Sequence, residues 1–121
     1  MAKIVVKQKA EVKQEFILPT DKDTFLVGTE ADNDLIIHDK RVSMKHLEIK
    51  RSETGWQVKD LRSAFGTFLN HRSINKVTEL KNGDQLDVGN TSLFFYCEKP
   101  VPPANETGQS GTESDPDYKN A

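Results

Sequence analysis

The amino-acid sequence predicts an all-β protein, folded as an antiparallel β-sandwich of about ten short strands. Apolar residues come in short runs, several of which alternate with charged neighbours as the side chains of a half-buried strand do. Turn residues separate these runs at close spacing, and no window of about eleven residues shows a helical apolar period. Many short strands with frequent turns are typical of a sandwich.

The first predicted strands are apolar runs that end at residues poorly suited to a strand. Runs at residues 4–6 and 12–18 come first, and the second stops at a proline, which has no N–H to donate to a ladder. The next run, residues 24–27, stops at Gly28. Residues 35–37 form a brief apolar run between turn residues, and we predict a further strand there.

Residues 47–58 give the clearest hairpin. Apolar and charged residues alternate on the approach, and residues 53–55 (Glu-Thr-Gly) supply a turn. Trp56 and Val58 resume the alternation on the return strand. We therefore expect Trp56 to lie in the core.

Three more strands are predicted in the last third of the sandwich, at residues 67–69, 85–88 and 92–96. An Asn-Gly dipeptide precedes the second of them, and a Gly-Asn dipeptide separates the second from the third. Residues 72–80 carry three apolar side chains at helical spacing. That segment is short and lies between turns, so no helix is predicted there.

The composition changes sharply near Lys99. We assign residues 1–99 to the sandwich and residues 100–121 to a disordered tail or linker, which is rich in Pro, Gly and Ser and acidic overall. Residues 101–121 carry four acidic residues and one lysine, a net charge of −3 within the chain's −2, which leaves +1 for the remainder. A domain so close to neutral lacks the basic face that a nucleic-acid partner requires.

The sequence also bears on the compartment. No apolar run approaches the roughly 20 residues of a membrane span, and the N-terminus lacks the apolar core of a signal peptide. The one cysteine, Cys97, cannot form an internal disulfide and lies in an apolar run, where we expect a packed thiol. These features predict a cytoplasmic or nuclear protein with no membrane partner.

Polar residues gather in two loops. Ser43 and His46 lie three residues apart before one strand, and Gly66 and Thr67 follow a second polar loop about twenty residues later. A rigid β scaffold can bring such loops to one end, where hydroxyls and amides hold a partner. Ser43 has a plainer alternative, which is to cap the turn before the strand.

The sequence contains no recognisable catalytic machinery. Ser43 and His46, on the approach to a strand, would point to opposite faces rather than toward each other. There is no H-E-x-x-H, Cys-His cluster, P-loop or G-x-G-x-x-G. The sequence therefore predicts a binding protein and not an enzyme, with no catalytic residue, cofactor or metal site.

A set of landmarks comes in order along the chain: Gly28, residues 33–37 (NDLII), residues 43–46 (SMKH), Asp60, residues 66–70 (GTFLN), Gly83, Asp84, Val88 and Gly89. Together they resemble the forkhead-associated (FHA) domain over about residues 3–98. This family is an eleven-stranded β-sandwich of the FHA/SMAD type that recognises phosphothreonine in short peptides through loops at one end. The resemblance therefore implies a module for protein–protein interaction in signalling.

The resemblance implies a role for each matching residue. Ser43 would bind the phosphate through its hydroxyl, and His46 would hold the loop that presents Ser43. Thr67 would begin the next strand and contribute to the peptide site. Asn70 would brace the binding loops and contact the peptide backbone. The structural positions would also include Gly28 and Gly66.

The pocket departs from the family pattern. Thr29 stands where the family has an arginine after the glycine, and Phe65 stands where an asparagine precedes the Gly-Thr pair. Ala64 and Met44 replace residues that are often polar. The phosphothreonine pocket is therefore degenerate: its serine, histidine and Gly-Thr frame remain, but its cation and its peptide-gripping amide are missing.

A phosphate carries about −1.5 to −2 charges at neutral pH and needs a cation as well as hydroxyl and amide donors. Losing one charged hydrogen bond costs about 1.5–3 kcal/mol, which is about 10- to 150-fold in affinity.

Arg41, Lys45 and Arg62 are the candidate replacement cations, and the alternative for each is a solvated surface charge. Phe65 is either a core residue that closes its loop or an exposed apolar contact. Thr29 and Phe65 complete the candidate peptide-contacting positions.

Two functions remain open. In the first, the domain recognises phosphothreonine peptides or a phosphorylated partner. In the alternative, a degenerate FHA domain docks or dimerises without phosphate through an apolar patch around Phe65 and Met44. Thr112 begins a T-x-x-D string in the tail, so the chain's own tail, once phosphorylated, is a further candidate ligand.

Overall fold

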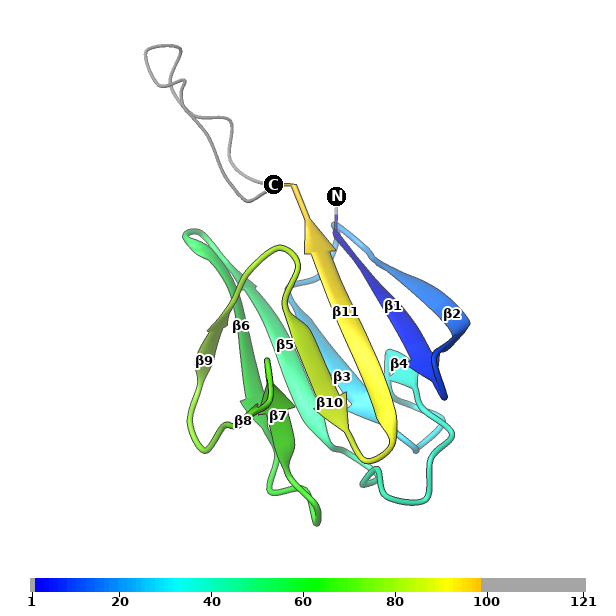
Figure 1. Cartoon of the computed structure of the whole chain (residues 1–121). Coiled ribbons are helices and arrows are strands. Elements are labelled where there is room, and N and C mark those ends of the chain that lie inside the picture. Colours follow the sequence, from blue (N-terminus) through cyan, green and yellow to red (C-terminus); the bar gives the residue numbers. More distant parts are fainter. Residues whose placement is uncertain (1, 99–121) are drawn as a thin grey trace, which may run out of the picture.

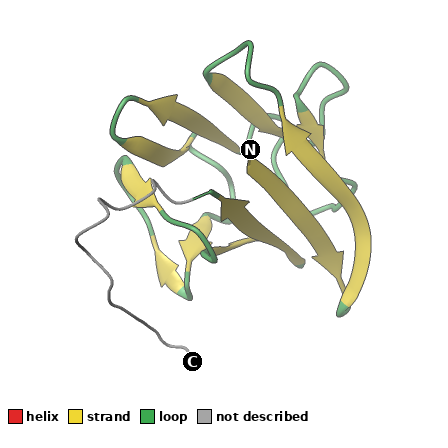
Figure 2. Ribbon diagram, turned by 90° about the horizontal axis from the view of Figure 1, so that it is seen from above, coloured by secondary structure: helices red, strands yellow, loops and turns green. Residues whose placement is uncertain are grey.

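The computed structural model describes residues 2–98, which form eleven strands in two sheets packed face to face (Figure 1). This part of the chain consists of strands and loops only, as Figure 2 shows from above. The strands are β1 (Ala2–Gln8), β2 (Glu11–Leu18), β3 (Thr24–Gly28), β4 (Leu35–Ile36), β5 (Leu47–Ser52), β6 (Gly55–Asp60), β7 (Thr67–Leu69), β8 (Arg72–Ser73), β9 (Thr78–Leu80), β10 (Gln85–Val88) and β11 (Thr91–Cys97). The predicted all-β class is confirmed.

The two sheets are almost entirely antiparallel. One has six strands in the order β2-β1-β11-β10-β7-β8, with antiparallel neighbours throughout. The other has five strands in the order β4-β3-β5-β6-β9. Its only parallel pair is β3 with β4, in which Val27 lies beside Leu35 and Gly28 beside Ile36. The antiparallel sandwich is thus as predicted, with one two-residue exception.

Alternate residues of the strands fill the space between the sheets because successive side chains of a strand point to opposite faces. Trp56 is half-buried and lies between Phe25 and Phe95, with ring centroids 6.1 and 5.3 Å apart. Aromatic pairs in such tilted and edge arrangements contribute about 0.5–1.5 kcal/mol beyond their buried area. The buried apolar residues are Ala2, Ile4, Val6, Leu18, Phe25, Val27, Leu35, Ile37, Val42, Leu47, Ile49, Val58, Leu80, Leu86, Val88, Leu93 and Phe95.

Residues 72–80 form two short strands that the sequence did not predict. β8 pairs with β7 and β9 pairs with β6, so tertiary pairing decides the conformation of this segment. Leu80 is buried while Val77 is half exposed, so the apolar residues at helical spacing do not share one buried face. Both glycine turns lie where they were predicted, with positive φ angles of 89° at Gly83 and 58° at Gly89.

Some predictions fall partly or wholly outside residues 2–98. The tail or linker at residues 100–121 and its candidate phosphosite Thr112 lie outside the described residues. Cys97, the last residue of β11, is half-buried. None of the described residues forms a helix of the length and apolarity that a membrane crossing needs.

Four loops come together at one end of the sandwich, the lower end in Figure 1; they join β3 to β4, β4 to β5, β6 to β7, and β10 to β11. Asp39 ties two of them together, because its carboxylate accepts the Asn90 N–H at 2.8 Å and the Thr91 hydroxyl at 2.7 Å. It also accepts the Arg41 N–H at 2.8 Å. Burial opposes ionisation, but these hydrogen bonds outweigh it and hold the pKa of Asp39 below its ordinary value. Asp39 thus organises these loops, a role that the sequence did not predict.

Candidate functional site

Ser43 joins the β4–β5 loop to the β6–β7 loop. Its Oγ accepts a hydrogen bond from the Ala64 N–H at 3.0 Å. A hydroxyl has one proton to donate besides its acceptor lone pairs. The proton of Ser43 therefore remains for a further acceptor, and the side chain is only partly buried.

His46 fixes the same two loops from inside. Its side chain is fully buried, its Nδ1 accepts the Ser43 N–H at 3.1 Å, and its Nε2 lies 2.9 Å from the Gly66 carbonyl. Since Nδ1 accepts, the proton belongs on Nε2, which donates to the carbonyl. His46 thus aligns the backbone of Ser43 with the turn before β7.

Gly28 allows the β3–β4 loop to lie against the β4–β5 loop. A Cβ at this position would lie 2.1 Å from the Met44 carbonyl oxygen and 2.8 Å from that of Ser43. The close approach lets the Thr29 N–H donate to the Ser43 carbonyl at 3.1 Å and the Glu30 N–H donate to the Met44 carbonyl at 3.3 Å. Thr29 is therefore held beside the backbone of Ser43.

Asp60 organises the β6–β7 loop. Its carboxylate accepts the Ser63 hydroxyl and N–H, and the Thr67 hydroxyl at 2.6 Å. Thr67 is fully buried, so its hydroxyl serves this internal network rather than the solvent-facing side of the loops. Burial opposes ionisation of Asp60, but the hydrogen bonds from Ser63 and Thr67 outweigh it and lower its pKa from the ordinary 3.8.

This network predicts acid sensitivity. Because the pKa of Asp60 is lower when folded than when unfolded, its contribution is complete above the unfolded value, near 3.8, and is lost as the pH falls through the folded value. We expect Asp60→Asn to lower the free energy of unfolding at pH 7 and to flatten its pH dependence below about pH 5. Urea denaturation across this pH range measures both, and Asp21→Asn, an exposed aspartate, is the control. An Asp60→Asn curve parallel to wild type would contradict the assignment.

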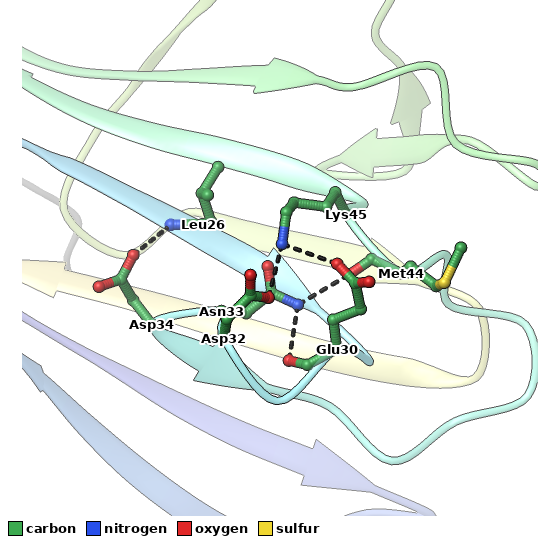
Figure 3. Close-up of polar contacts among 7 residues, drawn as sticks. All are labelled: Leu26, Glu30, Asp32, Asn33, Asp34, Met44 and Lys45. Atoms are coloured by element: carbon green, nitrogen blue, oxygen red, sulfur yellow. Dashed lines mark hydrogen bonds and ion pairs between the residues drawn. The ribbon is translucent and has the colours of Figure 1, made fainter.

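Lys45 is committed to two carboxylates, as Figure 3 shows. Its Nζ lies 2.8 Å from Glu30 Oε1 and 2.7 Å from Asp32 Oδ1. Hydrogen bonds to Asp32, which has the larger effect, and to Glu30 raise the pKa of Lys45. Asn33 holds the β3–β4 loop, which carries Glu30 and Asp32, against the β4–β5 loop, since its Nδ2 donates to the carbonyls of Glu30 and Met44. Of the three candidate cations, Lys45 is thus the one whose charge is already balanced.

Arg41 and Arg62 remain exposed, and neither forms an ion pair within residues 2–98. The guanidinium carbon of Arg41 lies 5.5 Å from the centroid of the Phe65 ring. Phe65 is 58% exposed and Met44 is 63% exposed. Of the two alternatives for Phe65, the exposed one therefore holds, and Phe65 does not close its loop from the core.

Asn70 lies apart from these residues, at the other end of β7. Thr67 pairs with Val88 beside the β10–β11 turn, whereas Asn70 follows Leu69 and bonds the opposite end of β10. Its side chain donates to Asp84 and accepts the Gln85 N–H, each at 3.0 Å. The structure thus brings Ser43, Thr29, Arg41, Arg62 and Phe65 to one set of loops, and leaves Asn70 outside it.

Comparison with known proteins agrees with this architecture. The family model for the FHA domain matches residues 25–89, which is more than half of the chain. The chain belongs to the FHA domain family. Its match spans the loops that carry Ser43, His46 and Phe65.

Individual relatives of this FHA domain are also found. The oxoglutarate dehydrogenase inhibitor of Corynebacterium jeikeium is 33% identical over 94 residues, which covers 78% of this chain and 63% of the relative. The chain spans between 56% and 66% of the length of the curated relatives it matches.

Two solved structures share the fold. The FHA domain of CT664 from Chlamydia trachomatis superposes with a TM-score of 0.73 at 23% identity, covering 81% of this chain and 98% of that one. EmbR of Mycobacterium tuberculosis, in complex with a low affinity phosphopeptide, superposes with a TM-score of 0.69 at 22% identity, covering 84% of this chain and 26% of EmbR.

Proposed function

We propose that this FHA domain binds a phosphothreonine-containing segment of a partner protein through Ser43. The observation that carries the proposal is the state of the Ser43 hydroxyl. Its oxygen is fixed by the Ala64 N–H at 3.0 Å, which leaves its proton for an incoming acceptor. A phosphate offers three acceptor oxygens, and loops fixed in advance lower the entropy cost of holding a flexible peptide.

The charges around Ser43 support an anionic ligand. Lys45 is held by Glu30 and Asp32, and the carboxylate of Asp39 accepts three hydrogen bonds from its own and neighbouring loops. Arg41 and Arg62 are exposed and make no ion pair within residues 2–98. An arginine outside any ion pair is the kind of cation that a phosphate needs beside hydroxyl and amide donors.

The comparisons support the same class of ligand. The family match and the phosphopeptide complex of EmbR both concern FHA domains or proteins that share their fold. We propose that the domain acts as an interaction module in signalling and not as an enzyme. We also place it inside the cell, where kinases supply phosphothreonine.

A direct test is the affinity for a peptide selected from a phosphothreonine library, compared with its unphosphorylated twin. Ser43→Ala removes a hydrogen bond to a charged group and should weaken the phosphopeptide about tenfold or more. Ser73→Ala, at an exposed serine on β8, is the control and should stay within about twofold. Equal binding of both peptides by the wild type, or an unchanged affinity in Ser43→Ala, would refute the proposal.

A second candidate function rests on the exposure of Phe65 and Met44, which are 58% and 63% accessible. These two apolar side chains could dock a partner without phosphate, or join two copies of the domain. In that case Phe65→Asn should weaken phosphorylated and unphosphorylated partners equally. Unchanged partner capture and an unchanged oligomeric state in Phe65→Asn would remove this candidate.

A further inference from the structure

Among the departures from the family pattern, Thr29 and Phe65 replace the two residues that would grip the ligand, and Phe65 makes a new contact in the structure. Thr29 takes the place of the arginine and Phe65 that of the asparagine. The Phe65 ring, although exposed, lies under the Arg41 guanidinium with 5.5 Å between the guanidinium carbon and the ring centroid. A cation within about 6 Å of a ring centroid is attracted by the negative face of the ring.

We propose that Phe65 is a positioning residue that holds Arg41 beside Ser43, so that the Arg41–Phe65 pair replaces the missing arginine in binding the phosphothreonine dianion. This inference rests on the proposed function and names the cation of that same site. Arg41 would bind the phosphate, and Phe65 would act through Arg41.

The Ser43 hydroxyl and the Arg41 guanidinium both contact residues 64–65. Ala64 donates its N–H to the Ser43 hydroxyl at 3.0 Å, and Phe65, the next residue, carries the ring under Arg41. Arg41 itself precedes Ser43 by two residues in the β4–β5 loop. The hydroxyl and the guanidinium therefore converge on residues 64–65 from one loop, as a two-group phosphate site requires.

The backbone of Arg41 is fixed, which leaves its side chain as the part that adapts. Its N–H donates to Asp39 at 2.8 Å, and a Cβ on Gly89 would lie 2.8 Å from the Arg41 Cβ. Asp39 lies within Coulombic range of Arg41 and competes with a phosphate for it, while its oxygens accept the N–H groups of Arg41 and Asn90 and the Thr91 hydroxyl. The guanidinium stacks on Phe65 and forms no ion pair within residues 2–98.

The other two candidate cations differ from Arg41 in this respect. Lys45 is held by Glu30 and Asp32. Arg62 is exposed and has no aromatic partner among the cation–ring contacts of residues 2–98. Arg62 is therefore a matched control for charge without a ring.

The test compares variants in binding the library-selected phosphopeptide, its unphosphorylated twin, and a capped single phosphothreonine that has no neighbouring side chains. Arg41→Gln should weaken both phosphorylated probes about tenfold or more. Phe65→Leu keeps an apolar side chain but removes the ring, and should weaken them about two- to fivefold. Phe65→Tyr keeps the ring and should bind as wild type, and Arg62→Gln should stay within about twofold. The double variant Arg41→Gln/Phe65→Leu should be no weaker than Arg41→Gln alone.

The outcomes separate this inference from the proposed function. If the wild type shows no preference for phosphate, both fail together. If it prefers phosphate but Phe65→Leu binds as wild type, or Arg62→Gln carries the tenfold loss, the function stands and the Arg41–Phe65 assignment is overturned. Equal weakening of phosphorylated and unphosphorylated peptides by Phe65→Leu also overturns it, because that is the signature of apolar contact. Because both side chains are exposed, all variants should unfold at the wild-type midpoint, which circular dichroism checks.

Discussion

Replacing His46 by alanine is expected to lower the free energy of unfolding by about 3–5 kcal/mol, the range for truncating a large buried side chain. The ring is fully buried and bridges two loops through the Ser43 N–H and the Gly66 carbonyl. Alanine leaves a cavity and two backbone groups without their partner, and each unsatisfied group costs about 1–3 kcal/mol. Since small domains have about 5–15 kcal/mol in total, this variant should be marginal.

Urea denaturation with a fixed spectroscopic probe measures this loss. His38→Ala is the matched control, because His38 is an exposed histidine in the same β4–β5 loop, and it should change stability by no more than about 0.5 kcal/mol. A His46→Ala domain as stable as His38→Ala would show that the buried ring does not support the loops.

Gly28→Ala should lower stability by about 3 kcal/mol or more, the upper end of the cost of overpacking. Its new Cβ would lie 2.1 Å from the Met44 carbonyl oxygen, and backbone atoms cannot move aside as a flexible side chain can. The β3–β4 loop would have to separate from the β4–β5 loop. The N–H groups of Thr29 and Glu30, which donate to Ser43 and Met44, should lose their protection from hydrogen exchange.

Gly83→Ala provides the comparison for this variant. Gly83 has open space around its Cβ position but a positive φ of 89°, so alanine there is strained without a clash. It should cost about 1–3 kcal/mol and leave the exchange of Thr29 and Glu30 unchanged. If Gly28→Ala also keeps that protection, the close approach of the two loops is not what requires a glycine.

The sequence predicted the sandwich well because strands such as β5, β10 and β11 bury alternate residues, and β2, β3 and β10 end at, or one residue before, a glycine or proline. The prediction at residues 67–69 coincides with β7, and residues 85–88 coincide with β10. β8 and β9 were not predicted, because two or three residues are too few to show the alternation of buried and exposed side chains that marks a strand. β8 is extended because it pairs with β7, and β9 because it pairs with β6; the local sequence does not show such pairings.

The site was harder to predict because its residues depend on partners distant in sequence. Lys45 looked like a phosphate cation, but its acidic partners come from a loop 13 to 15 residues earlier. Thr67 has its hydroxyl turned inward to Asp60, and Asn70 is separated from the site by the length of β7. Phe65 sits between two small residues, and only the packed loops show that its ring is exposed under Arg41.

The central claim is that a phosphothreonine side chain binds where the β4–β5 and β6–β7 loops meet. Amide chemical shifts during titration with a phosphothreonine peptide measure this residue by residue. The amide signals of Arg41, Ser43 and Ala64 should shift in a saturable manner, and the unphosphorylated twin should leave them unchanged. Identical shifts with both peptides, or changes confined to the opposite end of the sandwich, would contradict it.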